Sequence, residues 1–293
     1  MKGLIIINGY PNGVKFFHQA ERIAEELIAL GVATTIMKNG EVCALLNGDG
    51  RAENNLLEEY SFAIYLDKDK YLGRMLEACG LRLFNCAEAV ELCDDKMRTY
   101  LALQDSDVPL VRTIPAPLCY TPNVLPDEAF LSYVAEKLSF PLVAKKSYGS
   151  FGAGVQLIRD FSELKKMERE WLYTPHFYQA YVQESSGRDI RVIVIGGKAI
   201  GAMERVAQEG EFRSNVELGG QGRKVCLDVV YAEVAEKTAK ALGLDYCGVD
   251  LLEGKDGAIV CEVNSNAFFE GFESVTGINV AKAYASYVLK CFS

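Results

Sequence analysis

The spacing of apolar and polar residues alternates between strand and helix patterns in the first part of the chain. Gly3 to Asn8 is a continuous apolar run that predicts a buried strand. Residues 16–30 place apolar side chains at helical spacing, and Gly31 follows as a C-terminal cap. Further strands are expected at 32–37, 62–66 and 81–84, with a helix at 71–79. This alternation predicts a small parallel α/β domain over residues 1–92.

A second unit is expected over residues 93–183. The sequence DDKMRTYLAL has helical spacing, and a proline-rich connector with a strand at 110–114 follows it. The remaining pattern predicts strands at 141–145, 155–159 and 177–182 and a helix at 161–171.

The third unit, residues 184–293, is predicted from two hairpin signals. The first joins residues 189–195 to 198–206 through Gly196 and Gly197. The second joins 248–252 to 258–263 through the turn Gly254 to Gly257, with helices expected at 231–242 and 279–290.

Composition narrows the function classes. With 293 residues, 49% of them hydrophobic, the chain can bury a sizeable core, and its net charge of −9 argues against a non-specific nucleic-acid binder. Nine cysteines without a C-x-x-C pair favour reduced thiols over a disulfide framework or a zinc site. We expect no signal sequence or membrane helix, because no apolar run approaches about 20 residues. The sequence therefore predicts a cytoplasmic protein with neither a nucleic-acid nor a membrane partner; an oligomer stays open.

A glycine-rich stretch follows the predicted strand 141–145. In AKKSYGSFGAGV, Lys145 ends the strand and three glycines precede the next one. Such glycines let backbone N–H groups approach anionic oxygens, and a strand-end lysine adds a charge for the same phosphates. The stretch is not a Walker A loop. A plain glycine-rich hairpin with solvated lysines remains an equal alternative.

The second hairpin carries three hard oxygen ligands. Asp250 lies on one strand and Glu262 and Asn264 on its partner, so pairing can bring all three to one face. Such ligands suit Mg²⁺. The alternative is an amphipathic hairpin with solvent-facing polar residues, which the apolar neighbours disfavour because an unpaired buried carboxylate is costly. The strand period places Cys261 on the opposite, apolar face.

Two arginines, Arg205 and Arg213, lie in the stretch MERVAQEGEFRSN. Arginine can hold a transferring phosphoryl group through paired N–H donors. For a single arginine, surface pairing with the neighbouring glutamates is the commoner outcome.

Taken together, these motifs resemble the ATP-grasp superfamily and, more narrowly, its RimK-like branch of amino-acid ligases. The resemblance runs from about residue 80 to the C-terminus and rests on Asp95-Lys96, PLVAK with GSFGAGV, Asp189-Ile190-Arg191, MERVAQEGEFRSN, GVDLL and CEVNSN. It implies a fold of the α/β class that also contains α+β units. The expected parts are an N-terminal parallel α/β domain, a central lid-type domain and a C-terminal ATP-grasp domain.

The resemblance also implies roles for individual residues. Lys96 and Lys145 would contact the ATP phosphates, and the loop 147–154, with Ser150 and Gly152, would close over them. Ala180 and Tyr181 would lie at the adenine hinge and Asp189 near the ribose. Catalytic Arg205 and Arg213, with Ser214 and Asn215, would lie at the phosphates and the reacting acyl group. The implied metal ligands for Mg²⁺ or Mn²⁺ are Asp250, Glu262 and Asn264.

The implied reaction is ADP-forming ligation. A carboxylate is activated by ATP as an acylphosphate, and an amine then attacks it. The partners would be small-molecule carboxylates and amines, with a peptide or protein tail left open. Two other hypotheses stay open: an ATP-binding regulatory subunit without catalysis, and a dinucleotide-dependent enzyme built on residues 8–13, which lack G-x-G-x-x-G.

Two positions depart from the family pattern. Ala180 stands where many relatives carry a glutamate, a modest change because the hinge reads adenine largely through backbone groups. After Asn264 the chain continues SNAFF where the family commonly has a Ser-Pro-Gly turn. We therefore expect residues 265–271 to line the substrate side of the cleft, with at least one of Phe268 and Phe269 facing it.

Overall fold

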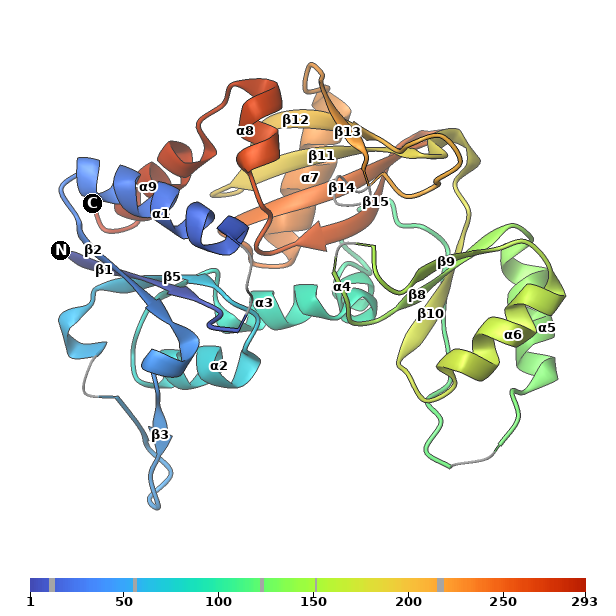
Figure 1. The fold of residues 1–293 in the computed structure, drawn as a ribbon, viewed down its shortest axis with the longest axis horizontal. Helices are drawn as coiled ribbons and strands as arrows, with labels where there is room; N and C mark the ends of the chain where they lie inside the picture. The colour runs from blue at the N-terminus through green and yellow to red at the C-terminus, as the bar shows by residue number, and fades with distance from the viewer. Residues whose placement is uncertain (11–13, 55–56, 122–123, 151, 215–218) are drawn as a thin grey trace.

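Three main sheets lie along the chain in the computed structural model, which describes residues 1–10, 14–54, 57–121, 124–150, 152–214 and 219–293 (Figure 1). The expected units each contain one of these sheets; their boundaries stay a prediction. Asn215, one of the predicted site residues, lies outside the described residues.

The first sheet is parallel, as the alternation of strands and helices predicted. Its strand order is β2-β1-β5-β6. The strands are β1 (Lys2–Ile7), β2 (Ala33–Lys38), β5 (Phe62–Leu66) and β6 (Leu83–Phe84), and the helices are α1 (Val14–Ala29), α2 (Lys70–Ala78) and α3 (Ala87–Asp94). A small hairpin of β3 (Leu45–Leu46) and β4 (Ala52–Glu53) projects from this unit. The carboxyl ends of β1 and β5 point toward the rest of the molecule, where Asn8 and Asp67 follow them.

The first and third units share one hydrophobic core. Apolar side chains of β1 and α1 pack in the same cluster as those of two C-terminal helices, α8 (Glu270–Thr276) and α9 (Val280–Lys290). Figure 1 shows α9 beside α1 at the end of the chain. The N-terminal domain is therefore completed by C-terminal residues, which the sequence pattern did not predict.

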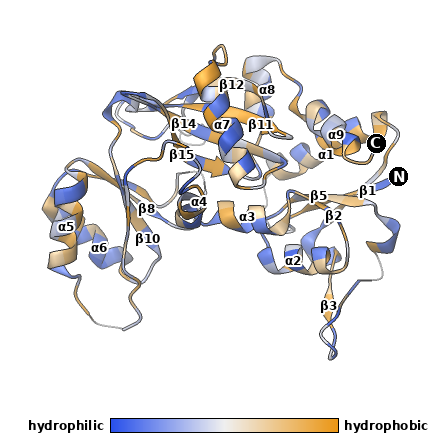
Figure 2. Cartoon of the chain, turned by 180° about the vertical axis from the view of Figure 1, so that it is seen from behind, coloured by the Kyte–Doolittle hydropathy of each residue, from blue (hydrophilic) through white to orange (hydrophobic). Residues whose placement is uncertain are grey.

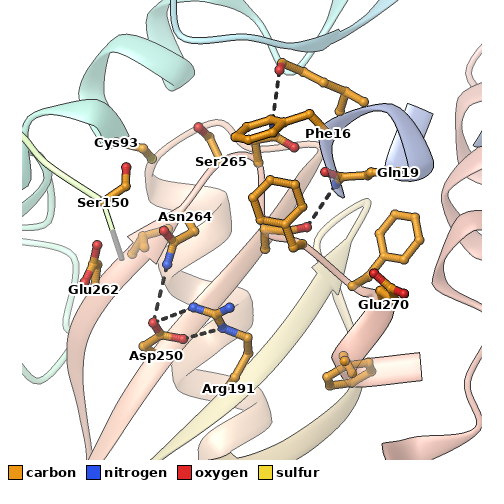
Figure 3. A pocket seen from close by; sticks show the side chains of 18 of the residues that line it. Phe16, Gln19, Cys93, Ser150, Arg191, Asp250, Glu262, Asn264, Ser265 and Glu270 are labelled. Atoms are coloured by element: carbon orange, nitrogen blue, oxygen red, sulfur yellow. Dashed lines mark hydrogen bonds and ion pairs between the residues drawn. The ribbon is translucent and has the colours of Figure 1, made fainter. Parts of the chain in front are cut away.

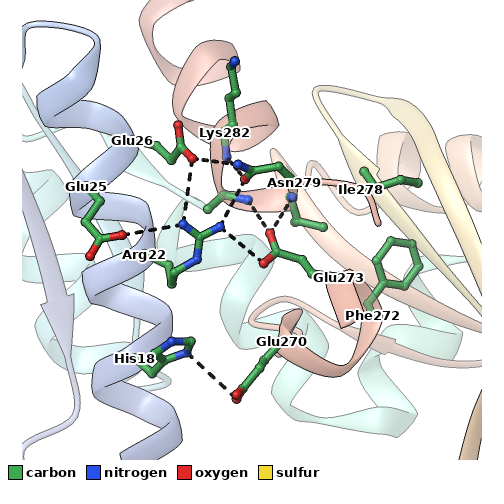
Figure 4. A network of polar contacts seen from close by, with 12 residues as sticks. His18, Arg22, Glu25, Glu26, Glu270, Phe272, Glu273, Ile278, Asn279 and Lys282 are labelled. Carbon is green, nitrogen blue, oxygen red and sulfur yellow. Dashed lines mark hydrogen bonds and ion pairs between the residues drawn. The ribbon is translucent and has the colours of Figure 1, made fainter. Parts of the chain in front are cut away.

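A polar network holds α1 against α8 and α9 (Figure 4). Arg22 Nη2 lies 3.4 Å from Glu273 Oε2, and the other oxygen of Glu273 accepts a hydrogen bond from the backbone nitrogen of Val280 at 2.7 Å. Asn279 caps α9 and donates to Glu26 Oε1 at 2.7 Å. These contacts fix the helix from which Phe16 and Gln19 reach the cleft described below.

The central unit is a four-stranded sheet with two helices on one side (Figure 2). Its strands, in sheet order, are β7 (Thr113–Pro115), β10 (His176–Ala180), β8 (Leu142–Lys146) and β9 (Val155–Ile158), and its helices are α5 (Glu128–Leu138) and α6 (Phe161–Trp171). The predicted strand 110–114 is wrong in extent, because only residues 113–115 pair with β10. His176 is a packing residue: it is buried and bonds to Glu168 and Tyr178.

The third sheet is antiparallel, with the order β13-β12-β11-β14-β15. Its strands are β11 (Arg188–Ile195), β12 (Lys198–Val206), β13 (Gln221–Lys224), β14 (Tyr246–Gly254) and β15 (Gly257–Asn264). Helix α7 (Val229–Ala241) covers its back, and α4 (Lys96–Ala102) lies where the three units meet. Both predicted hairpins are confirmed.

A β-bulge interrupts the pairing of β14 and β15. Asp250 lies opposite Glu262, but the next residue, Leu251, lies opposite Val260, so Cys261 is the extra residue. Val260 and Val263 both enter the core behind the sheet. The expectation that Cys261 faces the apolar side is therefore wrong. The bulge turns its thiol toward Lys145, whose Nζ lies 3.4 Å from Sγ.

None of the helices in the described parts of the chain is both long and apolar enough to cross a membrane.

Candidate active site

Neighbouring strands of the third sheet present polar side chains on one face. Because successive side chains of a strand alternate between faces, cross-strand partners project to the same side. The register pairs Asp189 with Arg205, Arg191 with Asp250, Asp250 with Glu262 and Gly248 with Asn264. The sheet thus brings together predicted residues that are far apart in the sequence.

Asp250 is bonded by two guanidinium groups. Arg191 Nε and Nη2 donate to its two carboxylate oxygens at 2.7 and 2.8 Å, and Arg205 Nη2 lies 2.8 Å from Oδ2. Burial alone would raise the pKa of Asp250, but the attraction of the two arginines outweighs it and holds the pKa below its usual value. Asp250 is an anion in this arrangement.

Arg205 joins Asp250 to Asp189. Its Nε and Nη2 donate to the carboxylate of Asp189, each at 2.7 Å, and Ser214 donates from its hydroxyl to the same carboxylate. Burial opposes the charge of Arg205, yet Asp250 and Asp189 raise its pKa further. Asp189 therefore contacts Arg205 and Ser214, and its place near the ribose stays a prediction.

Glu262 and Asn264 lie beside this cluster, at the end of β15. Lys96, the first residue of α4, places Nζ 3.6 Å from Glu262 Oε1 and donates to the carbonyl oxygen of Gly149 at 2.6 Å. Asn264 Nδ2 lies 3.4 Å from Asp250 Oδ2. Lys96 thus contacts both the predicted metal site and the glycine-rich loop.

The donor set fits a hard divalent cation. Among the described residues no group of three or more His, Cys, Asp and Glu side chains could hold a metal ion, so the candidate rests on two carboxylates and one amide. Carboxylate and amide oxygens are the ligands that Mg²⁺ prefers, and it usually keeps waters and substrate phosphates as further ligands. Oδ2 of Asp250 accepts from both arginines, but among the described residues Oδ1 accepts only from Arg191 Nε, so it keeps a lone pair with which Asp250 could join such a site.

Lys145 lies across from this face, at the end of β8. It is buried, and its ammonium group bonds to Cys261. Tyr100 supports the bulge, because its hydroxyl donates to the carbonyl oxygen of Val260 at 2.8 Å. Lys146, the next residue, points the other way and lies over the ring of Trp171.

The glycine-rich loop contacts several units at once. Ser150 accepts a hydrogen bond from Lys68 Nζ at 3.2 Å, and Gly152 offers its carbonyl oxygen to Arg213 Nη1 at 3.0 Å. Arg213 is paired with Glu211 at 2.8 Å; this bond raises the pKa of Arg213 and lowers that of Glu211 to about 2. The loop is therefore held from the N-terminal domain on one side and from the third unit on the other.

A cleft of about 820 Å³ opens between the first and third units (Figure 3). Lys96, Ser150, Arg205, Asp250, Glu262 and Asn264 line it, as do residues 265–271. Phe268 makes an edge-to-face contact with Phe16 in this lining, 5.0 Å between ring centroids. Phe269 borders the cleft as well, but it is only 2% exposed and packs in the core. The expectation that at least one of the two rings faces the cleft is confirmed.

Two predicted residues lie apart from the cluster. Ala180 and Tyr181 are at the end of β10, and neither lines the cleft. The backbone nitrogen of Ala180 donates to Arg112, and the hydroxyl of Tyr181 donates to Ser186. Their position, where the central sheet connects to β11, agrees with a hinge, but their contact with adenine stays a prediction.

Sequence reasoning missed four polar contributors. Arg191 was noted only as part of a motif, although its spacing of two from Asp189 is the signal that places it on the same face. Asn8, Asp67 and Lys68 follow the parallel strands β1 and β5, so their position at a carboxyl edge could have identified them as cleft residues.

The fold defines the class: a parallel α/β domain is followed by two α+β units, and a polar cleft lies between the first unit and the third, as in ATP-grasp proteins. A crystal structure of a RimK-domain ATP-grasp protein from Sphaerobacter thermophilus matches 98% of this chain and 99% of its own, with a TM-score of 0.74 at 16% identity. At that identity the match shows the fold alone.

Sequence comparison then gives the family. The model of the RimK-like ATP-grasp domain matches residues 95–288, so the chain belongs to the RimK-like ATP-grasp family, as the motifs predicted. A β-citrylglutamate synthase B from Danio rerio is 37% identical over 227 residues, 76% of this chain and 54% of that protein. A probable α-L-glutamate ligase from Thioalkalivibrio sulfidiphilus is 34% identical over 217 residues, 73% of this chain and 69% of that protein. The chain spans about half the length of the first of these relatives.

Proposed function

We propose that this protein is an ATP- and Mg²⁺-dependent ligase that joins a carboxylate to an amine and releases ADP and phosphate. The observation that supports this most strongly is the convergence of Lys96, Arg205, Asp250, Glu262 and Asn264 on one cleft. Relatives named as synthases and ligases of glutamate compounds support the same reaction class.

The cationic residues would bind the nucleotide phosphates. Lys145 and Lys96 both lie beside the glycine-rich loop: Lys145 precedes it in the sequence, and Lys96 donates to the carbonyl oxygen of Gly149 within it. Both can therefore place an ammonium group at phosphate oxygens under that loop. Arg205 and Arg191 offer paired N–H donors to the charge that develops as the phosphoryl group moves to the carboxylate. Arg213 and Ser214 would support the same region, and Ala180 and Tyr181 would form the adenine hinge.

Asp250, Glu262 and Asn264 would hold the metal ion. A bound Mg²⁺ would supply charge neutralisation at the phosphate oxygens. The protein's own contribution is rigidity: the three side chains project from paired strands whose register is fixed by the bulge at Cys261.

The residues of the cleft would position the two substrates and exclude water. Closure of the loop that contains Ser150 would shield a mixed anhydride from hydrolysis. The substrates would be a carboxylate donor and an amine acceptor; the names of the relatives favour amino-acid substrates, glutamate among them. A cytoplasmic location belongs to this proposal, since all nine cysteines are free thiols.

The ATP-binding subunit without catalysis is the competing hypothesis. The presence of the complete set of predicted phosphate and metal residues disfavours it, because a subunit without catalysis would be free to lose them. The dinucleotide hypothesis gains no support from residues 8–13, three of which lie outside the described residues.

The test is a product analysis with purified protein, ATP, Mg²⁺ and paired pools of amino acids. We expect ADP and phosphate in equal amounts, formed only when a carboxylate and an amine are both present, and a condensed product by mass spectrometry. AMP and pyrophosphate as stoichiometric products, or no turnover with any pair, would contradict the proposal. The variant Arg205→Lys should remain folded but form neither ADP nor condensed product.

A further inference from the structure

Two buried oxygen atoms in the residues that form the cleft have no hydrogen-bond partner among the described residues: Asp67 Oδ2 and Asn266 Oδ1. Asp67 follows β5 and is 4% exposed, and Asn266 follows β15. Both residues line the cleft, one from each wall. Since buried acceptors are nearly always satisfied in folded proteins, a group with N–H or O–H donors is the missing partner.

The two residues are held next to each other. Asn266 Nδ2 donates at 3.0 Å to the carbonyl oxygen of Leu66, the residue before Asp67. Asp67 Oδ1 accepts from Asn8 Nδ2 at 2.9 Å and from the backbone nitrogen of Lys68 at 2.7 Å. One end of each side chain is thus fixed by the protein, and the other end of each is an acceptor without a donor.

Asp67 is also the carboxylate of the cleft without a cation. Of the other acidic side chains that line the cleft, Asp250 pairs with Arg191 and Arg205 and Glu262 pairs with Lys96, whereas Glu270 is 65% exposed to solvent. Neighbouring Lys68 pairs with Asp94 at 2.9 Å instead. Over the described part of the chain no lysine, arginine or histidine forms an ion pair with Asp67, so the missing donor should carry a positive charge.

We propose that Asp67 and Asn266 bind a protonated amino group of the carboxylate-donating substrate; this rests on the ligase function proposed above. An ammonium group supplies both the charge and several N–H donors for two acceptors. It has no lone pair, so the amino group bound here is not the attacking amine. The donor is therefore an amino acid, or a peptide with a free amino group, whose carboxylate turns toward Arg191 and Arg205 on the sheet.

The experiment uses hydroxylamine as the amine acceptor, so that only the carboxylate donor varies. Hydroxamate and ADP formation are measured for L-amino acids and for their desamino analogues, such as L-glutamate with glutarate and L-aspartate with succinate. The variant is Asp67→Asn, which keeps size and removes the charge. The matched control is Asp69→Asn: this residue caps α2, where asparagine is an equally good cap, and does not line the cleft.

We expect the wild-type protein and Asp69→Asn to prefer the amino acid over its desamino analogue by at least tenfold in kcat/KM. In Asp67→Asn the KM of the amino acid should rise at least tenfold with the KM of ATP unchanged, while the desamino analogue is unaffected. The thermal midpoint of Asp67→Asn should equal or exceed that of the wild type, because an uncompensated buried charge is removed.

Three results would overturn the subsite. The first is a wild-type enzyme that does not discriminate between the amino acid and its desamino analogue. The second is an equal loss of kcat/KM with both donors in Asp67→Asn. The third is a lowered thermal midpoint of Asp67→Asn with no change in its donor preference. If no donor is turned over, the proposed ligase function is contradicted. Thermal-shift titration with the same amino acids then tests separately whether the subsite binds an amino group. Stabilisation of the wild type and Asp69→Asn but not of Asp67→Asn supports it, and no stabilisation of the wild type contradicts it.

Discussion

Arg191 donates two hydrogen bonds to Asp250 across the β11–β14 pair, at 2.7 and 2.8 Å, and this bidentate contact occupies both oxygens of a residue predicted to bind metal. Arg205 adds a second guanidinium at Oδ2. The negative charge of Asp250 is therefore already neutralised by the protein, and the carboxylate is a structural element as well as a candidate ligand.

The first prediction concerns the stability of Asp250→Asn. Removing one partner of a buried ion pair leaves the other charges uncompensated, which typically costs about 3–5 kcal/mol. We expect the free energy of unfolding to fall by an amount of this order, measured by urea denaturation without metal. A repulsive cluster of carboxylates would instead make the variant more stable.

Glu262→Gln is the matched control for that experiment. Its side chain is 28% exposed and Lys96 is 3.6 Å away, so this pair should contribute no more than about 1 kcal/mol. Asp250→Asn with the same stability as Glu262→Gln would contradict the structural role of the arginine contacts. Both variants should lose ligase activity if the two carboxylates hold the metal.

The second prediction separates the two neighbouring lysines of β8. Lys145 is buried beside Cys261, whereas Lys146 lies over Trp171 on the other side of the strand. Replacing Lys145 by Met should weaken ATP binding by about 1.5–3 kcal/mol, roughly ten- to hundredfold, because a charged hydrogen bond to phosphate is lost. Lys146→Met should bind ATP as the wild type does. Calorimetric titration measures both, and unchanged affinity in folded Lys145→Met would return this lysine to a packing role.

The third prediction follows from the pair of Glu211 and Arg213. The hydrogen bond from Arg213 lowers the pKa of Glu211 to about 2, below its ordinary value of 4.5. A carboxyl group whose pKa is lowered on folding stabilises the protein above its unfolded pKa, and this stabilisation is lost as the pH falls toward the folded pKa. The difference in thermal midpoint between wild type and Glu211→Gln should therefore be constant from pH 7 to about 5 and shrink between about 4.5 and 2. A difference that stays constant down to pH 2 would show that the pair does not form in solution.

Residue spacing predicted the parts of the site that depend on one strand. Glu262 and Asn264 lie on one face because they are two apart, and the hairpins around them follow from their glycine turns. Cys261 shows the limit of prediction from residue spacing. The face of the sheet to which its side chain points depends on a bulge, and the bulge is set by the register with β14, which no local pattern contains. The covering of the first sheet by α9 is likewise a long-range contact between chain ends.

Helix α5 was missed for a different reason. The prolines before it indicated a connector, but Asp127 caps the helix and Leu131, Val134 and Leu138 are its buried positions at helical spacing. The signal was therefore present and was outweighed by the prolines. The partners of Asp250, in contrast, required the structure, because each arginine comes from a different strand.

The last prediction uses the different surroundings of two adjacent phenylalanines. Phe268 lines the cleft against Phe16, so Phe268→Leu should shift kcat/KM between substrates by about tenfold, the size expected for a changed apolar contact in a pocket, with ATP affinity constant. Phe269 borders the cleft, but its side chain is 2% exposed and packs in the core, so Phe269→Leu should lower the thermal midpoint more than Phe268→Leu does and leave substrate preference as it was. Hydroxamate formation over a panel of carboxylate donors measures preference, and calorimetry measures stability. Equal losses of stability with no change in preference in either variant would mean that both rings only pack the core, and that the substrate is selected elsewhere in the cleft.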